Sequence, residues 1–121
     1  MAYEESIKRI TLEAGADLSA KQFFFVSVSA DGQVDPTGDG AHADGVLQND
    51  PAAAGRAAEV AISGVVRVKC GGTVTRGGAV ASDANGKAVD AASGDVILGT
   101  ALETGASDTI IAMIFQPRGT V

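Results

Sequence analysis

The 121-residue chain has few of the residues that catalytic and metal sites require, since it contains one Cys, one His and no Trp. A single Cys cannot form an intramolecular disulfide, so a disulfide-stapled secreted fold is excluded. One His and one Cys also leave little material for a nucleophile–base pair or a zinc cluster. We therefore predict no catalytic, cofactor-binding or metal-binding residues, and a binding or structural role.

Basic residues and long apolar runs are scarce as well. Nine Lys and Arg against fifteen Asp and Glu give a net charge of −6. This sign is wrong for a general nucleic-acid binder, which has to neutralise phosphates. No segment approaches the roughly 18 apolar residues of a membrane span, and the polar N-terminus does not resemble a signal peptide. We predict no nucleic-acid partner and no membrane partner.

What the chain does have is short alternating segments separated by glycine-rich turns. There are 16 Gly, and aromatic residues make up only 4% of the chain, which favours a small aliphatic core. We predict an all-β domain, a small β-barrel or sandwich of about eight short strands with little helix. The strand candidates are residues 7–12, 23–28, 45–48, 58–62, 65–69, 79–82, 87–89, 96–102 and 109–115.

Two segments of this pattern are read as turns. Asn85-Gly86 predicts a two-residue type I′ hairpin between strands 79–82 and 87–89. Residues 31–45 contain three Asp-Gly pairs and one Asp-Pro pair, which is turn chemistry. Between residues 31 and 50 there are five Asp and no Lys or Arg, so the segment either holds a cation such as Ca²⁺ or is a solvated turn region. The EF-hand pattern fails there, because Val46 stands where a bidentate Glu is required.

Two further motifs do not predict a nucleotide-binding site or a catalytic nucleophile. Gly86-Lys87 would need Gly at position 81 and Ser or Thr at position 88 to form a phosphate loop, and both positions are Ala. Cys70 has Lys69 beside it but no second Cys, and the single His lies 28 positions away. We interpret Cys70 as a small, buried residue at the end of a strand.

Charge and apolar patterning point to contacts with other chains. Residues 56–87 hold five basic and two acidic residues, opposite in sign to residues 31–50. This predicts complementary docking between copies or onto a partner, the alternative being an ordinary mixed surface. Residues 23–26 and 110–115 are apolar on both faces, so either the monomer or another subunit covers the second face. The residues predicted for a subunit interface are Phe24, Val26, Ile111, Met113 and Phe115.

The segments GVLQNDPAAAGRAAEVAISGVVRVKCGGTVTRGGAVASDANGKAV and LGTALETGASDTIIAMIFQP resemble the small head decoration, or cement, proteins of tailed phages. The resemblance implies a β-tulip-like fold in a single domain, residues 1–121. It implies a non-enzymatic protein, made in the host cytoplasm, that forms homotrimers at local three-fold positions of the outer capsid surface. The partner there is the major capsid protein. The resemblance also implies a capsid-contacting N-terminal arm over residues 1–9, with Met1, Ala2, Tyr3, Glu4, Glu5, Ser6, Lys8 and Arg9.

Residues 116–121 are predicted to form a frayed C-terminal tail. The alternative function is a small β-barrel that binds a ligand or a carbohydrate. Such a site needs exposed aromatic rings for stacking, and Tyr3 is the one Tyr in a chain without Trp.

Overall fold

The computed structural model describes residues 2–121, which contain nine β-strands joined by turns and loops and no helix. The predicted all-β class is confirmed. Accordingly, no helix within residues 2–121 offers the length and apolar character needed to cross a membrane. The strands are β1 (Glu5–Ala14), β2 (Phe25–Ala30), β3 (Gln33–Pro36), β4 (Gly45–Leu47), β5 (Ala57–Lys69), β6 (Ala79–Ser82), β7 (Ala88–Asp90), β8 (Gly99–Ala101) and β9 (Ile110–Phe115).

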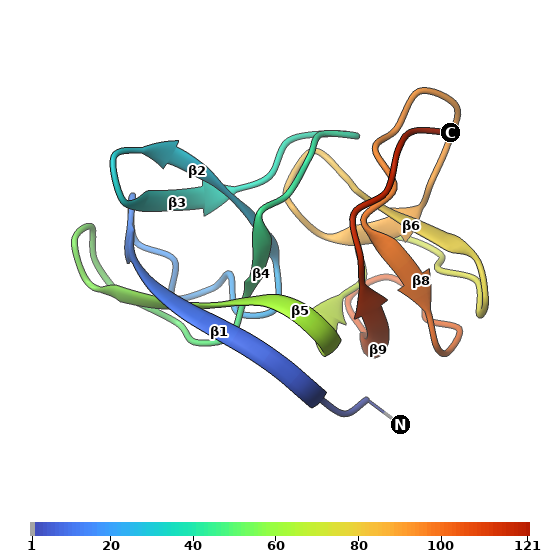
Figure 1. Ribbon diagram of the computed structural model, residues 1–121, viewed down its shortest axis with the longest axis horizontal. Helices are drawn as coiled ribbons and strands as arrows, with labels where there is room; N and C mark the ends of the chain where they lie inside the picture. The colour runs from blue at the N-terminus through green and yellow to red at the C-terminus, as the bar shows by residue number, and fades with distance from the viewer. Residues whose placement is uncertain (1) are drawn as a thin grey trace.

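All nine strands belong to one sheet, in the order β1-β3-β2-β4-β5-β9-β8-β6-β7. Strand β1 pairs with β5 as well as with β3, so the sheet curls back on itself and five strands form a partial ring. The other four strands continue from β5 through β9 and form the second half of the molecule (Figure 1). The ring is not a formally closed barrel, because β1 and β3 pair over only two residues.

Strand β5 is 13 residues long and contributes to two hydrophobic clusters. Its first half packs inside the partial ring, where Val60 lies with Leu18, Val26 and Leu47. Its second half supplies Val66 and Val68 to the larger cluster, which also contains residues of β6, β8 and β9. One continuous strand therefore connects the two halves and contributes side chains to both cores.

Three segments differ from the predicted strand pattern. Ser63-Gly64 does not break the chain into two strands, because β5 runs through it with Gly64 at φ 98°. Strand β3 lies inside the segment that was read as turns only. Phe23 has φ 69°, so the sheet begins at Phe25 rather than at residue 23.

The C-terminal tail is not frayed, which corrects the prediction for residues 116–121. Its backbone is hydrogen-bonded to residues 94–98 over its whole length: Arg118 N–H donates to Ile97, Ile97 N–H donates to Gly119, and Val121 N–H donates to Asp95. The Arg118 guanidinium also donates to the hydroxyl of Thr100 on β8 at 2.9 Å. These bonds hold the tail against the second half of the molecule.

The β6–β7 hairpin is confirmed, but its turn is longer than predicted. Ser82 is paired with Ala88, which leaves five residues between the strands. Gly86 has φ 89°, whereas Asn85 is not among the residues with positive φ, so the turn is not type I′. The Asp83 carboxylate accepts hydrogen bonds from the backbone N–H groups of Asn85 and Lys87 and shapes the turn instead.

Candidate docking surface

The predicted N-terminal arm is part of the sheet rather than a free segment before it. Strand β1 starts at Glu5 and is paired with β5 from Glu5↔Val65 to Glu13↔Ala57. This corrects the expectation that residues up to Ser6 precede the first strand. Met1 lies outside the described residues. Several side chains of the arm are nevertheless exposed, namely Tyr3, Glu5, Ser6, Lys8 and Arg9.

A local irregularity in β1 shapes this arm. The register of β1 against β5 shifts on both sides of Lys8, and Ser6 has φ 52°. Gly64 of β5 lies opposite, and a Cβ atom there would meet the Ser6 carbonyl oxygen at 2.5 Å. Glycine thus allows the two backbones to approach closely. Ile7 is turned inward onto the larger hydrophobic cluster and fixes the arm to the body of the protein.

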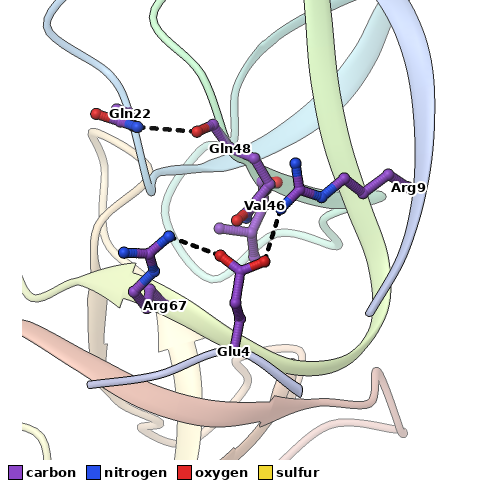
Figure 2. Close-up of polar contacts among 6 residues, drawn as sticks. All are labelled: Glu4, Arg9, Gln22, Val46, Gln48 and Arg67. Atoms are coloured by element: carbon purple, nitrogen blue, oxygen red, sulfur yellow. Dashed lines mark hydrogen bonds and ion pairs between the residues drawn. The ribbon is translucent and has the colours of Figure 1, made fainter. Parts of the chain in front are cut away.

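Glu4 ties the start of the arm to two strands. Its carboxylate accepts a hydrogen bond from Arg9 of β1 and another from Arg67 of β5, each at 2.6 Å (Figure 2). Burial by itself would raise the pKa of Glu4, but the hydrogen bonds and positive charges of Arg67 and Arg9 outweigh it and lower the pKa. The charged carboxylate is therefore the form that this junction stabilises.

Polar atoms next to this junction are incompletely hydrogen-bonded. Gln22 donates to the backbone oxygen of Gln48 at 2.9 Å, and the Gln48 amide nitrogen donates to the Val46 carbonyl at 3.1 Å (Figure 2). Within residues 2–121, the buried atoms Gln48 Oε1 and Arg67 Nε have no hydrogen-bond partner. Both belong to side chains fixed by other bonds, so we read them as a cost of packing this corner.

The five residues predicted for a subunit interface are buried within the single chain. Phe24, Val26, Ile111, Met113 and Phe115 are all at most 4% exposed. This corrects the assignment of those five side chains to an interface. The opposite face of β9 is the outward one, where Ile110 is 42% and Ile114 is 38% exposed. The sequence could not choose between the faces, because both are apolar.

Basic side chains surround this outward face of β9. In the β5–β9 register, Lys69 lies opposite Ile110, Arg67 opposite Ala112 and Val65 opposite Ile114, so these side chains share one face. The Arg67 guanidinium lies 4.8 Å from the centre of the Phe23 ring. Two of the basic residues of segment 56–87, Arg67 and Lys69, therefore lie together on this face in the structure.

Lys21 and Lys87 extend this basic region around Phe24. Their amino groups lie 5.1 Å and 5.6 Å from the centre of the Phe24 ring. Lys87 also pairs with Asp108 at 3.0 Å, and this contact, with a smaller contribution from Lys69, lowers the pKa of Asp108. Sequence analysis singled out Lys69 and Lys87 but not Lys21, which lies outside the basic segment 56–87.

The remaining candidates of the sequence analysis are dispersed. Asp44 accepts a hydrogen bond from the backbone N–H of Val28, and Asp35 accepts one from Ser29, so both shape the β2–β3 region. No group of three or more His, Cys, Asp or Glu side chains suited to a metal ion occurs within residues 2–121. Cys70 is fully buried, as predicted, and burial raises the pKa of its thiol.

Comparison with known proteins decides what kind of protein carries these surfaces. The family model described as phage cement protein matches residues 4–114, most of the chain. The chain belongs to the phage cement protein family. No curated protein sequence matches this cement protein. A crystal structure described as the N base of head fiber gp8.5 in bacteriophage phi29 shares its fold, with a TM-score of 0.72. That match has 17% identity and covers 95% of the cement protein and 98% of the other chain.

Family membership confirms the resemblance noted in the sequence. The cement protein is a structural component of a phage virion and not an enzyme. Its family also implies association with a capsid.

Proposed function

We propose that this cement protein binds the outer surface of the assembled capsid and stabilises it as a homotrimer at local three-fold positions. The match to the phage cement family over residues 4–114 carries the proposal. In this proposal residues 1–121 act as one decoration domain, and each trimer ties neighbouring major-capsid subunits together. The protein is made in the host cytoplasm and acts on the virion.

The stabilisation follows from mass action. A protein that binds the assembled shell but not its dissociated subunits adds about 2.7 kcal/mol per site at a free concentration one hundred times its Kd. A head carries many such sites, so modest affinities add up to considerable resistance against internal pressure. No chemical step is required, in agreement with a non-enzymatic family.

We assign capsid attachment to the outward side chains of the N-terminal arm. Glu5, Ser6, Lys8 and Arg9 are exposed on a strand that Ile7 and Glu4 fix to the body. Their positions are therefore set before binding, which reduces the conformational entropy lost on contact. In this proposal the contacting arm is a paired part of the sheet, whereas the sequence placed it before the first strand.

The test compares purified heads with and without the protein by cryo-electron microscopy and co-sedimentation. Added density at local three-fold positions on the outer surface is the expected result. Heads that neither bind the protein nor gain heat resistance from it would refute the proposal. Lys8→Glu should weaken co-sedimentation, whereas Arg76→Glu, the same charge change in the loop between β5 and β6, should not. Equal binding by the two variants would remove the arm from the contact.

A further inference from the structure

The outward surface of β5 and β9 and the end of the β2–β3 hairpin have opposite charge, and we infer that the first docks on the second between neighbouring copies. The inference rests on the proposed trimer and specifies its contact. The basic face consists of Lys21, Arg67, Lys69, Lys87, Ile110 and Ile114. The acidic edge consists of Val28, Asp31, Asp35 and Asp44.

The basic face has the composition of a protein interface. Ile110 and Ile114 are 42% and 38% exposed on the outward face of β9, with the small Ala112 between them, and cations border them. An apolar centre with a charged rim is the usual anatomy of such contacts. Four carboxylates lie at or beside this face: Glu4 is paired with Arg67, Asp108 is paired with Lys87, Glu103 accepts the Ala112 backbone N–H, and Glu5 lies opposite Val65. Within residues 2–121, Lys21 and Lys69 form no ion pair, so these two cations remain available to a partner.

Backbone strain coincides with this face. Phe23 adopts φ 69°, in the left-handed region that bulky residues avoid. Its carbonyl accepts the Lys69 backbone N–H at 2.9 Å, and its ring lies under Arg67. The strained residue thus connects Lys21 and Phe24 to β5 and holds the cations together. Strain of this kind is more often found where a surface has a function than elsewhere.

The acidic edge has complementary properties. Val28 is 55% exposed, and its backbone N–H is bonded to the carboxylate of Asp44. Asp31 and Asp44 are exposed, and within residues 2–121 no Lys or Arg forms an ion pair with them or with Asp35. The His42 imidazole lies 3.3 Å from the Asp44 carboxylate. The exposed Val28 therefore lies beside the Asp44 carboxylate, while Asp35 lies on the opposite face of the hairpin. Neither carboxylate has a Lys or Arg partner within residues 2–121.

A second copy of this chain is the occupant that the charges favour. The β2–β3 turn and β9 are far apart along the long axis of the molecule, so one chain cannot bring its own two surfaces together (Figure 1). Two different surfaces that bind each other form a head-to-tail contact, which closes into rings such as a trimer. A contact of either surface with its own copy would instead oppose like charges.

The experiment is a charge exchange, read by sedimentation velocity of the full chain. K21E/K69E and D31K/D44K each turn attraction into repulsion, and each should weaken association about tenfold. Combining all four substitutions in one chain restores complementarity and the net charge, and should restore association. Raising the salt from 0.1 M to 1 M should weaken association of the wild type, because the Debye length falls from about 10 Å to about 3 Å.

Controls separate this contact from general charge effects and from misfolding. R56E/R76E changes the net charge as much as K21E/K69E does, at exposed loop positions, and should leave association unchanged. D44K also removes the hydrogen bond from the Val28 backbone N–H to the Asp44 carboxylate, which could destabilise the fold. The second exchange pair is therefore K69E with D31K, because neither substitution breaks a side-chain hydrogen bond or ion pair within residues 2–121. Thermal melting verifies the fold of every variant.

The outcomes distinguish the inference from the proposed function. A wild type that stays monomeric, or a four-fold variant that does not recover association, would overturn the contact. Head binding is measured separately, and a monomer that still decorates heads would leave capsid attachment intact. Assemblies larger than trimers that respond to the same exchange would support the contact and overturn the trimer.

Discussion

Replacing Gly86 by Ala tests whether the turn of the β6–β7 hairpin packs so closely against β2 and β3 that only glycine fits there. A Cβ atom at Gly86 would meet the Phe25 carbonyl oxygen at 2.8 Å, Pro36 Cβ at 3.2 Å and Thr37 N at 3.3 Å. Two of these atoms are backbone and take part in the hydrogen bond from Thr37 N–H to the Phe25 carbonyl. The turn itself is held to β2 by a hydrogen bond from Phe25 N–H to the Gly86 carbonyl at 2.7 Å, so neither side can move away without disturbing one of these bonds.

Gly94 provides the matched control, because it has the same φ of 89° and nothing within 4 Å of its Cβ position. Gly94→Ala should lower the free energy of unfolding by about 1 kcal/mol, the cost of a left-handed Ala. Gly86→Ala adds a steric cost of about 1–3 kcal/mol.

Urea denaturation and thermal melting measure the difference between the two glycine variants. At about 4 °C per kcal/mol, Gly86→Ala should melt roughly 4–12 °C below Gly94→Ala. Equal losses would mean that backbone conformation alone decides the cost. In that case the docking of the hairpin on β2 contributes no steric constraint, and the reasoning is refuted.

Three further changes test the arm and the basic face. Glu4→Gln should lower the free energy of unfolding by about 1 kcal/mol at pH 7. Because the pKa of Glu4 in the folded protein lies below the ordinary 4.5, this difference from the wild type should disappear as the pH falls through the folded pKa. A difference in urea titrations that does not change with pH would contradict this. Lys87→Ala should cost about 1 kcal/mol through the loss of its contacts with Asp108 and Phe24. Equal urea denaturation midpoints for Lys87→Ala and Arg56→Ala would contradict this. Deleting residues 1–9 should lower the melting temperature, because it removes Ile7 from the core and several β1 residues that are paired with β5. Deleting residues 1–3 should leave the melting temperature within a few degrees of the wild type. The same loss for both deletions in circular-dichroism melts would contradict this.

Much of the sheet could be predicted from the sequence because alternation and turn chemistry act locally. Strands β6, β7 and β9 lie within about one residue of the predicted segments. Strand β3 was missed because Asp31-Gly32 precedes it and Asp35-Pro36 lies within it, and because its pairing with β1 and β2 depends on distant residues. Gly64 was read as a break because the sequence does not reveal that the backbone of Ser6 lies against it.

The candidate surface was predictable in kind but not in detail. The sequence indicates that 110–115 has two apolar faces, yet only the register with β5 shows that Ile110 and Ile114 are the outward pair. Charge segregation is visible in the sequence, whereas the gathering of Lys21 with Lys69 and Lys87 depends on the left-handed turn at Phe23. That conformation is a tertiary effect, because local propensity disfavours it.

The long antiparallel pair of β1 and β5 also determines how the protein bears mechanical load. Its seven registered residue pairs extend from Glu5↔Val65 to Glu13↔Ala57, and the side chains that we propose for capsid attachment lie at the N-terminal end of β1. A pull along β1 from that end loads these pairs together in shear, so no single hydrogen bond has to yield first. Strand β5 passes the force on to β9 through six further pairs. A shell that expands under internal pressure would thus pull the bound protein along its strands, the direction in which the hydrogen bonds of the sheet resist separation most.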